Sequence, residues 1–361
     1  MSSANLDAYD LSQVPLDGEI NEDVLQQLIR VNEWDNPILA MAGSRSTGNP
    51  YYSWTNRDYA APILDNQRVD GADASGNDTR NGIRVGNHSQ ILDKVLRVST
   101  RGRSVNTIGY ADSLALQISE RGTELMRDKE AQFASNNASV EATDTVAGVS
   151  AGIMAWLNNR NIQNDADTGV IASVASSNPS TDGGWVNRTG NTVPGRTYTG
   201  TVPGAVTEKA LKDACQAIYL QGGNPDCLVT VPELQRKMSE YFFTSGARIG
   251  TLESKIPQES RSGATAMGRV NVWVSDFQIL TLKSSRNMQV TDAATSSDSI
   301  MILDPSQLRT TTLTGLRVEA LAKTGTADNR QMSWDGGFQV DCWAKCGAIV
   351  DVDRTADMVA G

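Results

Sequence analysis

The sequence is poor in the residues that most often perform chemistry. Its 361 residues include one histidine, His88, and four cysteines. So few thiols are typical of a protein that is made in a reducing compartment and keeps its cysteines free. Cys342 and Cys346 would lie about 13 Å apart on a strand, which is too far for a disulfide or a shared tetrahedral zinc. We therefore expect no metal site and no cofactor.

Positive charge and long apolar runs are also scarce. The chain has 32 Lys and Arg against 42 Asp and Glu, a formal net charge of −10. Binding to nucleic-acid phosphates needs clustered Lys and Arg, so this balance argues against an electrostatically driven nucleic-acid binder. No apolar run approaches the roughly 18 residues of a membrane span, and the acidic N-terminal residues do not match a secretory signal. We expect a protein made in a cytoplasm, without a membrane.

The clearest periodic pattern is helical and covers residues 110–134. Apolar residues such as Leu114, Leu125 and Phe133 recur at helical spacing, with charged residues on the other faces. The pattern predicts a helix of about 25 residues, about 37 Å long. It would act as a spine between an extended, polar first third and a mixed remainder. Without a repeating strand–helix–strand spacing, the fold class expected is α+β.

Residues 51–106 have the pattern of two long strands joined by a polar, turn-forming tip at 70–79. The returning strand, 91–100, alternates apolar and polar residues. An isolated two-stranded ribbon is marginal in water, so we expect this one to rest on another surface. Its basic and aromatic side chains are candidate contacts between copies: Trp54, Arg57, Arg97, Arg101 and Arg103. Arg97, Arg101 and Arg103 would pair with acidic surfaces of a neighbouring copy. The alternative is a solvated ribbon with incidental basic residues.

Regular structure is expected on both sides of these segments. Before them, Pro37, Ile38 and Leu39 form a small apolar anchor in an extended segment. Residues 158–206, in contrast, are polar, and we interpret them as an excursion on the surface. The other predicted elements are a helix at 21–30, a helix capped by Thr207, a buried strand at 227–231, a helix beginning at Pro232, and strands at 270–282, 300–303, 316–321 and 338–350.

Two short motifs match catalytic signatures without their partners. Gly148–Gly152 has the Gly-x-Ser-x-Gly spacing around Ser150, but the only histidine lies upstream of it instead of downstream. Lys323-Thr-Gly325 matches one box of the penicillin-binding enzymes, whose other boxes are absent from the sequence. We interpret the first as a small-residue turn and the second as a turn between strands, and keep a serine hydrolase at Ser150 as an alternative.

Several stretches carry a family resemblance, in order along nearly the whole chain. They are Asn36-Pro-Ile-Leu39, Trp54-Thr-Asn-Arg-Asp58, Val98-Ser-Thr100 leading to Tyr110, Gly222-Gly-Asn-Pro-Asp226, Asp276-Phe277, Arg286-Asn-Met288, Leu303-Asp-Pro305 and Leu321-Ala-Lys-Thr-Gly325. Together they resemble the major capsid proteins of tailed bacteriophages, which have the HK97-like fold. Asp335-Gly-Gly337, where family members often have Glu, and the long excursion depart from the family pattern.

The resemblance implies an HK97-like α+β fold. Its parts would be an N-terminal arm (1–50), an extended β-hairpin loop (51–106), a peripheral domain around the spine helix (107–150 and 321–361) and an axial domain (151–320, including 158–206). It implies a structural protein, not an enzyme, that self-assembles into hexamers and pentamers. These would form the icosahedral head of a virion in the host cytoplasm, around double-stranded DNA that is not read by sequence. Implied partners are a scaffolding protein, a portal and cement proteins; an encapsulin-like compartment shell is the alternative.

Overall fold

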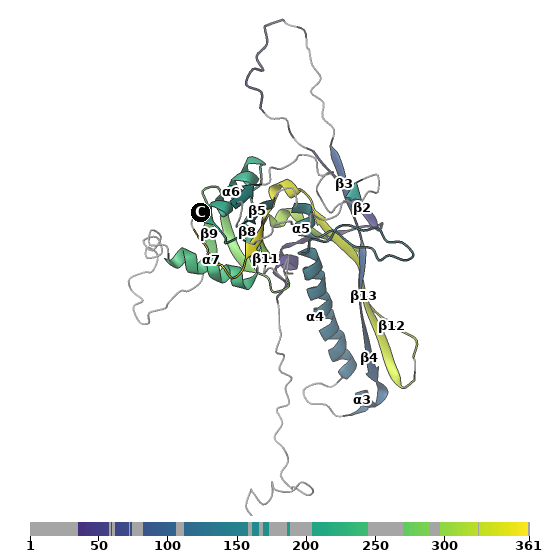
Figure 1. Cartoon of the computed structure of the whole chain (residues 1–361). Coiled ribbons are helices and arrows are strands. Elements are labelled where there is room, and N and C mark those ends of the chain that lie inside the picture. The colour runs from purple at the N-terminus through teal and green to yellow at the C-terminus, as the bar shows by residue number, and fades with distance from the viewer. Residues whose placement is uncertain are drawn as a thin grey trace, which may run out of the picture.

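The computed structural model describes residues 35–57, 59, 62–71, 73, 82–105, 112–157, 161–165, 169–172, 186–187, 204–244, 270–288, 297–323 and 325–359. The strands in these ranges form a four-stranded, a seven-stranded and a three-stranded sheet (Figure 1). The predicted helix at 21–30 and most of the polar excursion lie outside the described residues. Within them, no helix is both long enough and apolar enough to cross a bilayer.

The predicted spine helix is confirmed as α4, Ser113–Phe133. Asp112 begins it, because its Oδ1 accepts a hydrogen bond from Leu114 N at 2.9 Å and so satisfies one of the free N–H groups of the first turn. The helix lies along a long sheet and packs on two of its strands (Figure 1). At its C-terminal end Phe133 stacks on Phe338 with ring centroids 4.4 Å apart.

The sheet beside α4 has the order β1-β12-β13-β4. Its strands are β1 (Gly43–Ser46), β12 (Leu308–Ala320), β13 (Ala327–Val340) and β4 (Gln90–Ser99). β4 is the predicted returning strand, but its partner is β13, in an antiparallel register from Ala327 opposite Ser99 to Gly336 opposite Gln90. The expected pairing of this strand within the ribbon is therefore wrong. Its alternating apolar residues need a second layer to cover them, which α4 supplies.

The ribbon is formed instead by β2 (Tyr51–Asn56) and β3 (Ile83–His88), which pair antiparallel and are joined in a three-stranded sheet by β7 (Val186–Asn187). The anchor near Pro37 also differs from the prediction. It is a short helix, α2 (Pro37–Met41), with proline at a first-turn position where no N–H is needed. Ile38 within it is fully buried, so the anchoring role is right and the extended conformation is wrong.

The seven-stranded sheet is mixed and forms the second half of the subunit. Its strands in order are β6 (Gly169–Ala172), β5 (Asn161–Asp165), β14 (Gly347–Asp353), β11 (Ser297–Leu303), β8 (Cys227–Thr230), β10 (Ile279–Ser284) and β9 (Val272–Val274). α6 (Glu208–Leu220) packs on β14, and α7 (Pro232–Thr244) packs on β10. The predicted cap is confirmed, because Thr207 Oγ1 accepts a hydrogen bond from Ala210 N at 3.0 Å.

The strand predicted at 338–350 is interrupted. β13 ends at Val340, a 3-10 turn (η4) spans Trp343–Lys345, and β14 begins at Gly347 in the other large sheet. The buried Trp343 holds this crossover by stacking on Trp156 of α5 (Ile153–Trp156), with centroids 6.3 Å apart. The cysteines on either side of the turn consequently do not share a strand face. All four cysteines are free, and no cluster in the described ranges could hold a metal ion.

Lys129 is expected to make subunit stability depend on alkaline pH. Its Nζ lies 4.1 Å from the centroid of the Trp334 ring, and burial lowers the pKa of this amine to about 8. The unfolded lysine keeps a pKa of about 10.4. Between those values the unfolded chain binds a proton that the folded chain lacks, so this residue raises stability as pH increases and has no such effect below pH 8.

Melting curves of wild type and Lys129→Met at several pH values check this expectation. The difference in Tm should be constant between pH 6 and 7, which serves as the internal control, and should then shift by a few degrees in favour of wild type towards pH 10. Parallel curves across the whole range would contradict the role of Lys129.

Candidate assembly surfaces

The loop between β2 and β3 exposes large apolar side chains that the described part of the chain leaves uncovered. Among its described residues, Tyr59 is 100% exposed, Leu64 90%, Val69 81% and Ile63 65%. The loop projects from the three-stranded sheet, away from both large sheets (Figure 1). Isolated exposed apolar residues are ordinary, but a group of them on a projecting loop marks an interaction site.

A buried polar cluster, consisting of Tyr52, Asn87, Ser150 and Phe338, fixes the root of this loop. The Asn87 amide Nδ2 donates to Phe338 O at 2.7 Å and to Ser150 Oγ at 3.0 Å. Its Oδ1 accepts from Ala151 N at 3.0 Å and from the adjacent backbone N–H of His88 at 2.9 Å. One side chain thus joins β3, β13 and the segment before α5.

Tyr52 completes the root cluster from the neighbouring strand. Its hydroxyl donates to Phe338 O at 2.8 Å, and burial raises the pKa of this phenol to about 12. A Cβ at Gly337 would lie 2.3 Å from the Tyr52 hydroxyl oxygen and 2.7 Å from Ser150 Oγ. Glycine at 337 is therefore what allows the polar groups to meet, and the departure noted in the sequence at this point has a packing role.

Ser150 lies in a buried hydrogen-bond network. It is 1% exposed, and its Oγ accepts from Phe338 N at 3.0 Å as well as from Asn87. His88, the only histidine, lies elsewhere in the network, with its Nδ1 3.3 Å from Ser139 Oγ. Among the hydrogen bonds that Ser150 makes in the described part of the chain, none involves a histidine, so the base expected of a serine hydrolase does not lie beside it there.

Trp54 lies at the same root and packs within its own subunit. Its Nε1 donates to Asp341 O at 3.1 Å, and its ring lies 5.1 Å from that of Trp156. Arg57, three residues along the chain, is exposed. The structure therefore does not bring these two candidates together with the three arginines predicted further on.

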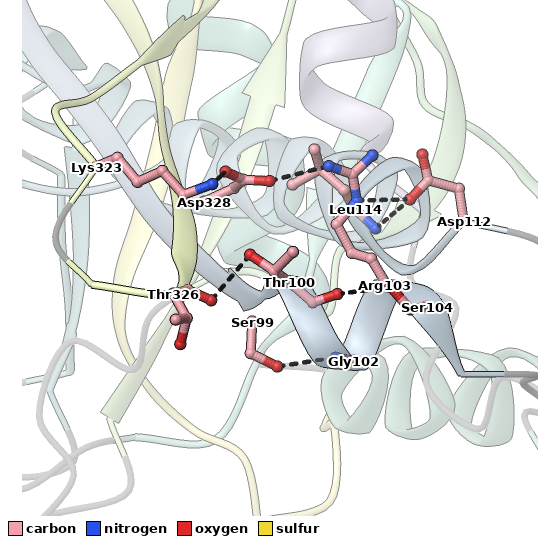
Figure 2. Close-up of polar contacts among 10 residues, drawn as sticks. All are labelled: Ser99, Thr100, Gly102, Arg103, Ser104, Asp112, Leu114, Lys323, Thr326 and Asp328. Carbon is pink, nitrogen blue, oxygen red and sulfur yellow. Dashed lines mark hydrogen bonds and ion pairs between the residues drawn. The ribbon is translucent and has the colours of Figure 1, made fainter.

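Those three arginines lie at the other end of β4, beside α3 (Thr100–Ser104). Arg97 is on β4, and Arg101 and Arg103 are on α3; all three are exposed. Arg103 reaches acidic partners in its own subunit: Asp328 at 2.9 Å and Asp112 at 3.6 Å. Figure 2 shows this row of charges, which Lys323 extends with a 3.2 Å contact to Asp328.

The charge row ties α3 to the turn between β12 and β13. Lys323 and Arg103 together lower the pKa of the Asp328 carboxyl. Thr100 adds a hydroxyl hydrogen bond to Thr326 O at 3.0 Å (Figure 2). The Lys323–Gly325 motif is confirmed as the connection between two strands, and Gly325, with φ of +74°, occupies a conformation that favours glycine.

A further surface was not predicted from the sequence. On the face of the long sheet turned away from α4, Ile91 is 71% and Val95 57% exposed. Ile91 also lines a hollow of about 640 Å³ together with Tyr51, Glu141 and Val146. The alternation of β4 places Ile91 and Val95 on the face opposite Leu92 and Leu96, but it does not indicate that this face stays exposed in the subunit.

Comparison with known proteins identifies the family. The sequence model of the SU10 major capsid protein family matches residues 5–353. The major capsid protein of Escherichia phage Phieco32 is 30% identical over 113 residues, a match that spans 31% of this chain and 31% of that relative.

Solved structures share the fold at low sequence identity. The capsid of a native GTA particle aligns over 96% of this chain and 99% of its own, with 12% identity and a TM-score of 0.56. A chain of Microbacterium phage Oxtober96 aligns over 92% and 96%, with 10% identity and a TM-score of 0.53. The SrpI encapsulin of Synechococcus elongatus PCC 7942 aligns over 94% of each chain, with 12% identity and a TM-score of 0.49. The fold is the HK97-like capsid fold, and the chain belongs to the SU10 major capsid protein family.

Proposed function

We propose that this chain is the structural subunit of a tailed-phage head, and that copies of it assemble into the hexamers and pentamers of an icosahedral shell around double-stranded DNA. The observation that carries the proposal is the projecting loop, whose apolar side chains are exposed while its root is fixed by a buried polar cluster. Because the root is already fixed, docking of the loop on a neighbour costs less ordering entropy than docking of a segment without such an anchor. One projecting surface that docks on a different surface of the next copy generates closed rings.

The proposed division of the chain follows the sheets. The arm would comprise residues 1–50 and the extended loop 51–106, although the pairing of β4 with β13 supports moving 90–99 into the peripheral domain with 107–150 and 321–361. The axial domain would be 151–320, with β12 shared between the two. The five predicted contacts, Trp54, Arg57, Arg97, Arg101 and Arg103, remain proposed intersubunit residues; Trp54 and Arg103 would act mainly by holding the surfaces in shape.

The role proposed is non-enzymatic, since the Ser150 hydroxyl makes hydrogen bonds that hold β13 in place. A net charge of −10 suits a shell that must not hold its packaged DNA tightly. Other copies of the chain are the primary partners, and a scaffolding protein, a portal and cement proteins are proposed as additional ones.

Replacing the exposed apolar residues of the loop is expected to abolish particle formation without unfolding the subunit. In the triple variant Tyr59→Ser, Leu64→Ser, Val69→Ser, the apolar area available for burial on a neighbour is lost, while the three side chains contribute little to packing within the described residues. The matched control is the double variant Asp65→Ser, Gln67→Ser, which changes exposed polar residues of the same loop.

The variants would be expressed with the other head proteins of the phage and analysed by sedimentation and negative-stain electron microscopy. We expect closed shells with wild type and the control, and soluble subunits of unchanged Tm with the triple variant. Normal shells from the triple variant would remove the loop from assembly. Shells that never protect DNA from nuclease, even with the complete set of head proteins, would favour the encapsulin alternative.

A further inference from the structure

The short helix α2 begins without the cap that helices of this kind normally have. Asn36 occupies the cap position, but its side chain makes no capping hydrogen bond. Pro37 carries no N–H, so the first backbone donors of the helix are those of Ile38 and Leu39. Ile38 is fully buried, and a buried donor without an acceptor destabilises the fold.

Glu130, near the end of α4, provides the missing acceptor from 91 residues away in the sequence. Its Oε2 accepts from Leu39 N at 3.4 Å, and the backbone N–H of Ile38 also hydrogen-bonds to this carboxyl. The other oxygen, Oε1, accepts from Ser285 Oγ at 2.6 Å. Glu130 and Ser285 are both fully buried. Burial raises the pKa of Glu130, and the hydrogen bonds from Ser285, Leu39, Asn287 and Ile38 oppose that rise.

Asn287 secures the residues just before the helix. Its Nδ2 donates to Asn36 Oδ1 at 2.9 Å and to Asp35 O at 3.3 Å. Its own backbone N–H donates to Ser285 Oγ at 3.3 Å, so the two residues form one buried turn directly after β10. The segment from Asp35 to Leu39 is therefore held between a carboxylate of α4 and an amide that follows a strand of the seven-stranded sheet.

We infer that Glu130 and Asn287 form a specific internal binding site for the segment 35–41, and that this site holds the segment between α4 and the turn after β10. The ligand is a helix N-terminus of the same chain, recognised by a buried carboxylate. α4 packs on the long sheet, and Asn287 follows β10 of the seven-stranded sheet. The segment 35–41 therefore contacts both of these parts of the subunit. A change in the position of α4 relative to the turn after β10 would therefore break the hydrogen bonds of this site. The site lies within one folded subunit, so its hydrogen bonds form whether or not shells assemble.

Hydrogen exchange of the full-length subunit, followed by mass spectrometry, tests the site. In Glu130→Ala, we expect peptides covering 36–46 to exchange about tenfold faster or more, because the first-turn donors of α2 lose their acceptor. Glu130→Gln should give an intermediate rate, since its amide oxygen can still accept from Leu39 while its NH2 faces Ser285, whose hydroxyl can accept. Asn287→Ala should also accelerate the same peptides. The matched control is Glu124→Ala on the same helix, which removes only the half-exposed pair with Arg121.

The exchange of β8 and β11, in the core of the seven-stranded sheet, separates a local effect from a global one. Unchanged exchange there, together with the graded increase at 36–46, supports the site. An equal increase in β8 and β11, or rates at 36–46 that match the control in all three variants, overturns it. If Glu130→Ala does not fold, the Glu130→Gln and Asn287→Ala variants decide by the same criteria.

Discussion

Asn87→Ala is expected to destabilise the subunit by about 3 kcal/mol or more, because one side chain supplies five hydrogen bonds in a fully buried position. Truncation leaves the buried Ala151 N–H without its acceptor. It also removes the donor that Ser150 Oγ and the Phe338 carbonyl share. The root of the projecting loop would lose the link between β3 and β13 and keep only that from Tyr52 to Phe338 O.

Urea denaturation of purified subunits measures this effect. Asn66→Ala, an exposed asparagine of the loop, is the control and should change the free energy of unfolding by less than about 0.5 kcal/mol. Asn87→Asp keeps the size of the side chain but turns a carboxylate oxygen towards two carbonyl oxygens, those of Phe338 and Ala151. It should be as damaging as alanine. A mild effect of both variants would mean that the cluster does not hold the root.

Gly152→Ala should lower the free energy of unfolding by about 3 kcal/mol, because it adds a methyl group where there is no room for one. A Cβ at this position would lie 2.2 Å from Ser135 O and 2.8 Å from Gln132 O, both backbone atoms at the end of α4. Backbone oxygens cannot rotate away as a flexible side chain could, so either α4 or α5 has to shift. A shift of α5 would also separate Trp156 from Trp54, so the root of the projecting loop would lose this contact.

The natural control is Gly48→Ala, where a Cβ would meet nothing within 4 Å. It should leave Tm nearly unchanged, whereas Gly152→Ala should lower it clearly and shift the near-ultraviolet circular dichroism of the tryptophan cluster. Equal Tm values for the two variants would show that α4 and α5 can move apart without a loss of stability.

The elements that the sequence predicted well are those whose signals are local. The stripe containing Leu114 and Phe133, the cap at Thr207 and the proline at 232 each act within a few residues, and α4, α6 and α7 follow them closely. The ordered set of family marks also pointed to the correct fold, because it sampled nearly the whole chain.

The predictions that were wrong concern elements whose partners are distant in the sequence. The alternation of β4 is the same whether it pairs with β2 or with β13, so periodicity could not choose between them. The break after Val340 arises because Trp343 packs into the aromatic cluster with Trp156, a contact that no local pattern encodes. Asn87 and Glu130 were missed for a related reason: a polar residue in a strand or helix looks solvent-exposed until its buried partners are known.

The pairing of early strands with late ones has a consequence for how the protein is made. β1 and β4 find their partners in β12 and β13, and β14 lies between β5 and β11 inside the other large sheet. Neither sheet can close on a nascent chain until its last segment has left the ribosome, and the loop root, which needs Phe338, cannot form before then. Neighbouring ribosomes on one messenger RNA thus carry chains that are not yet competent to associate, and assembly is confined to finished subunits.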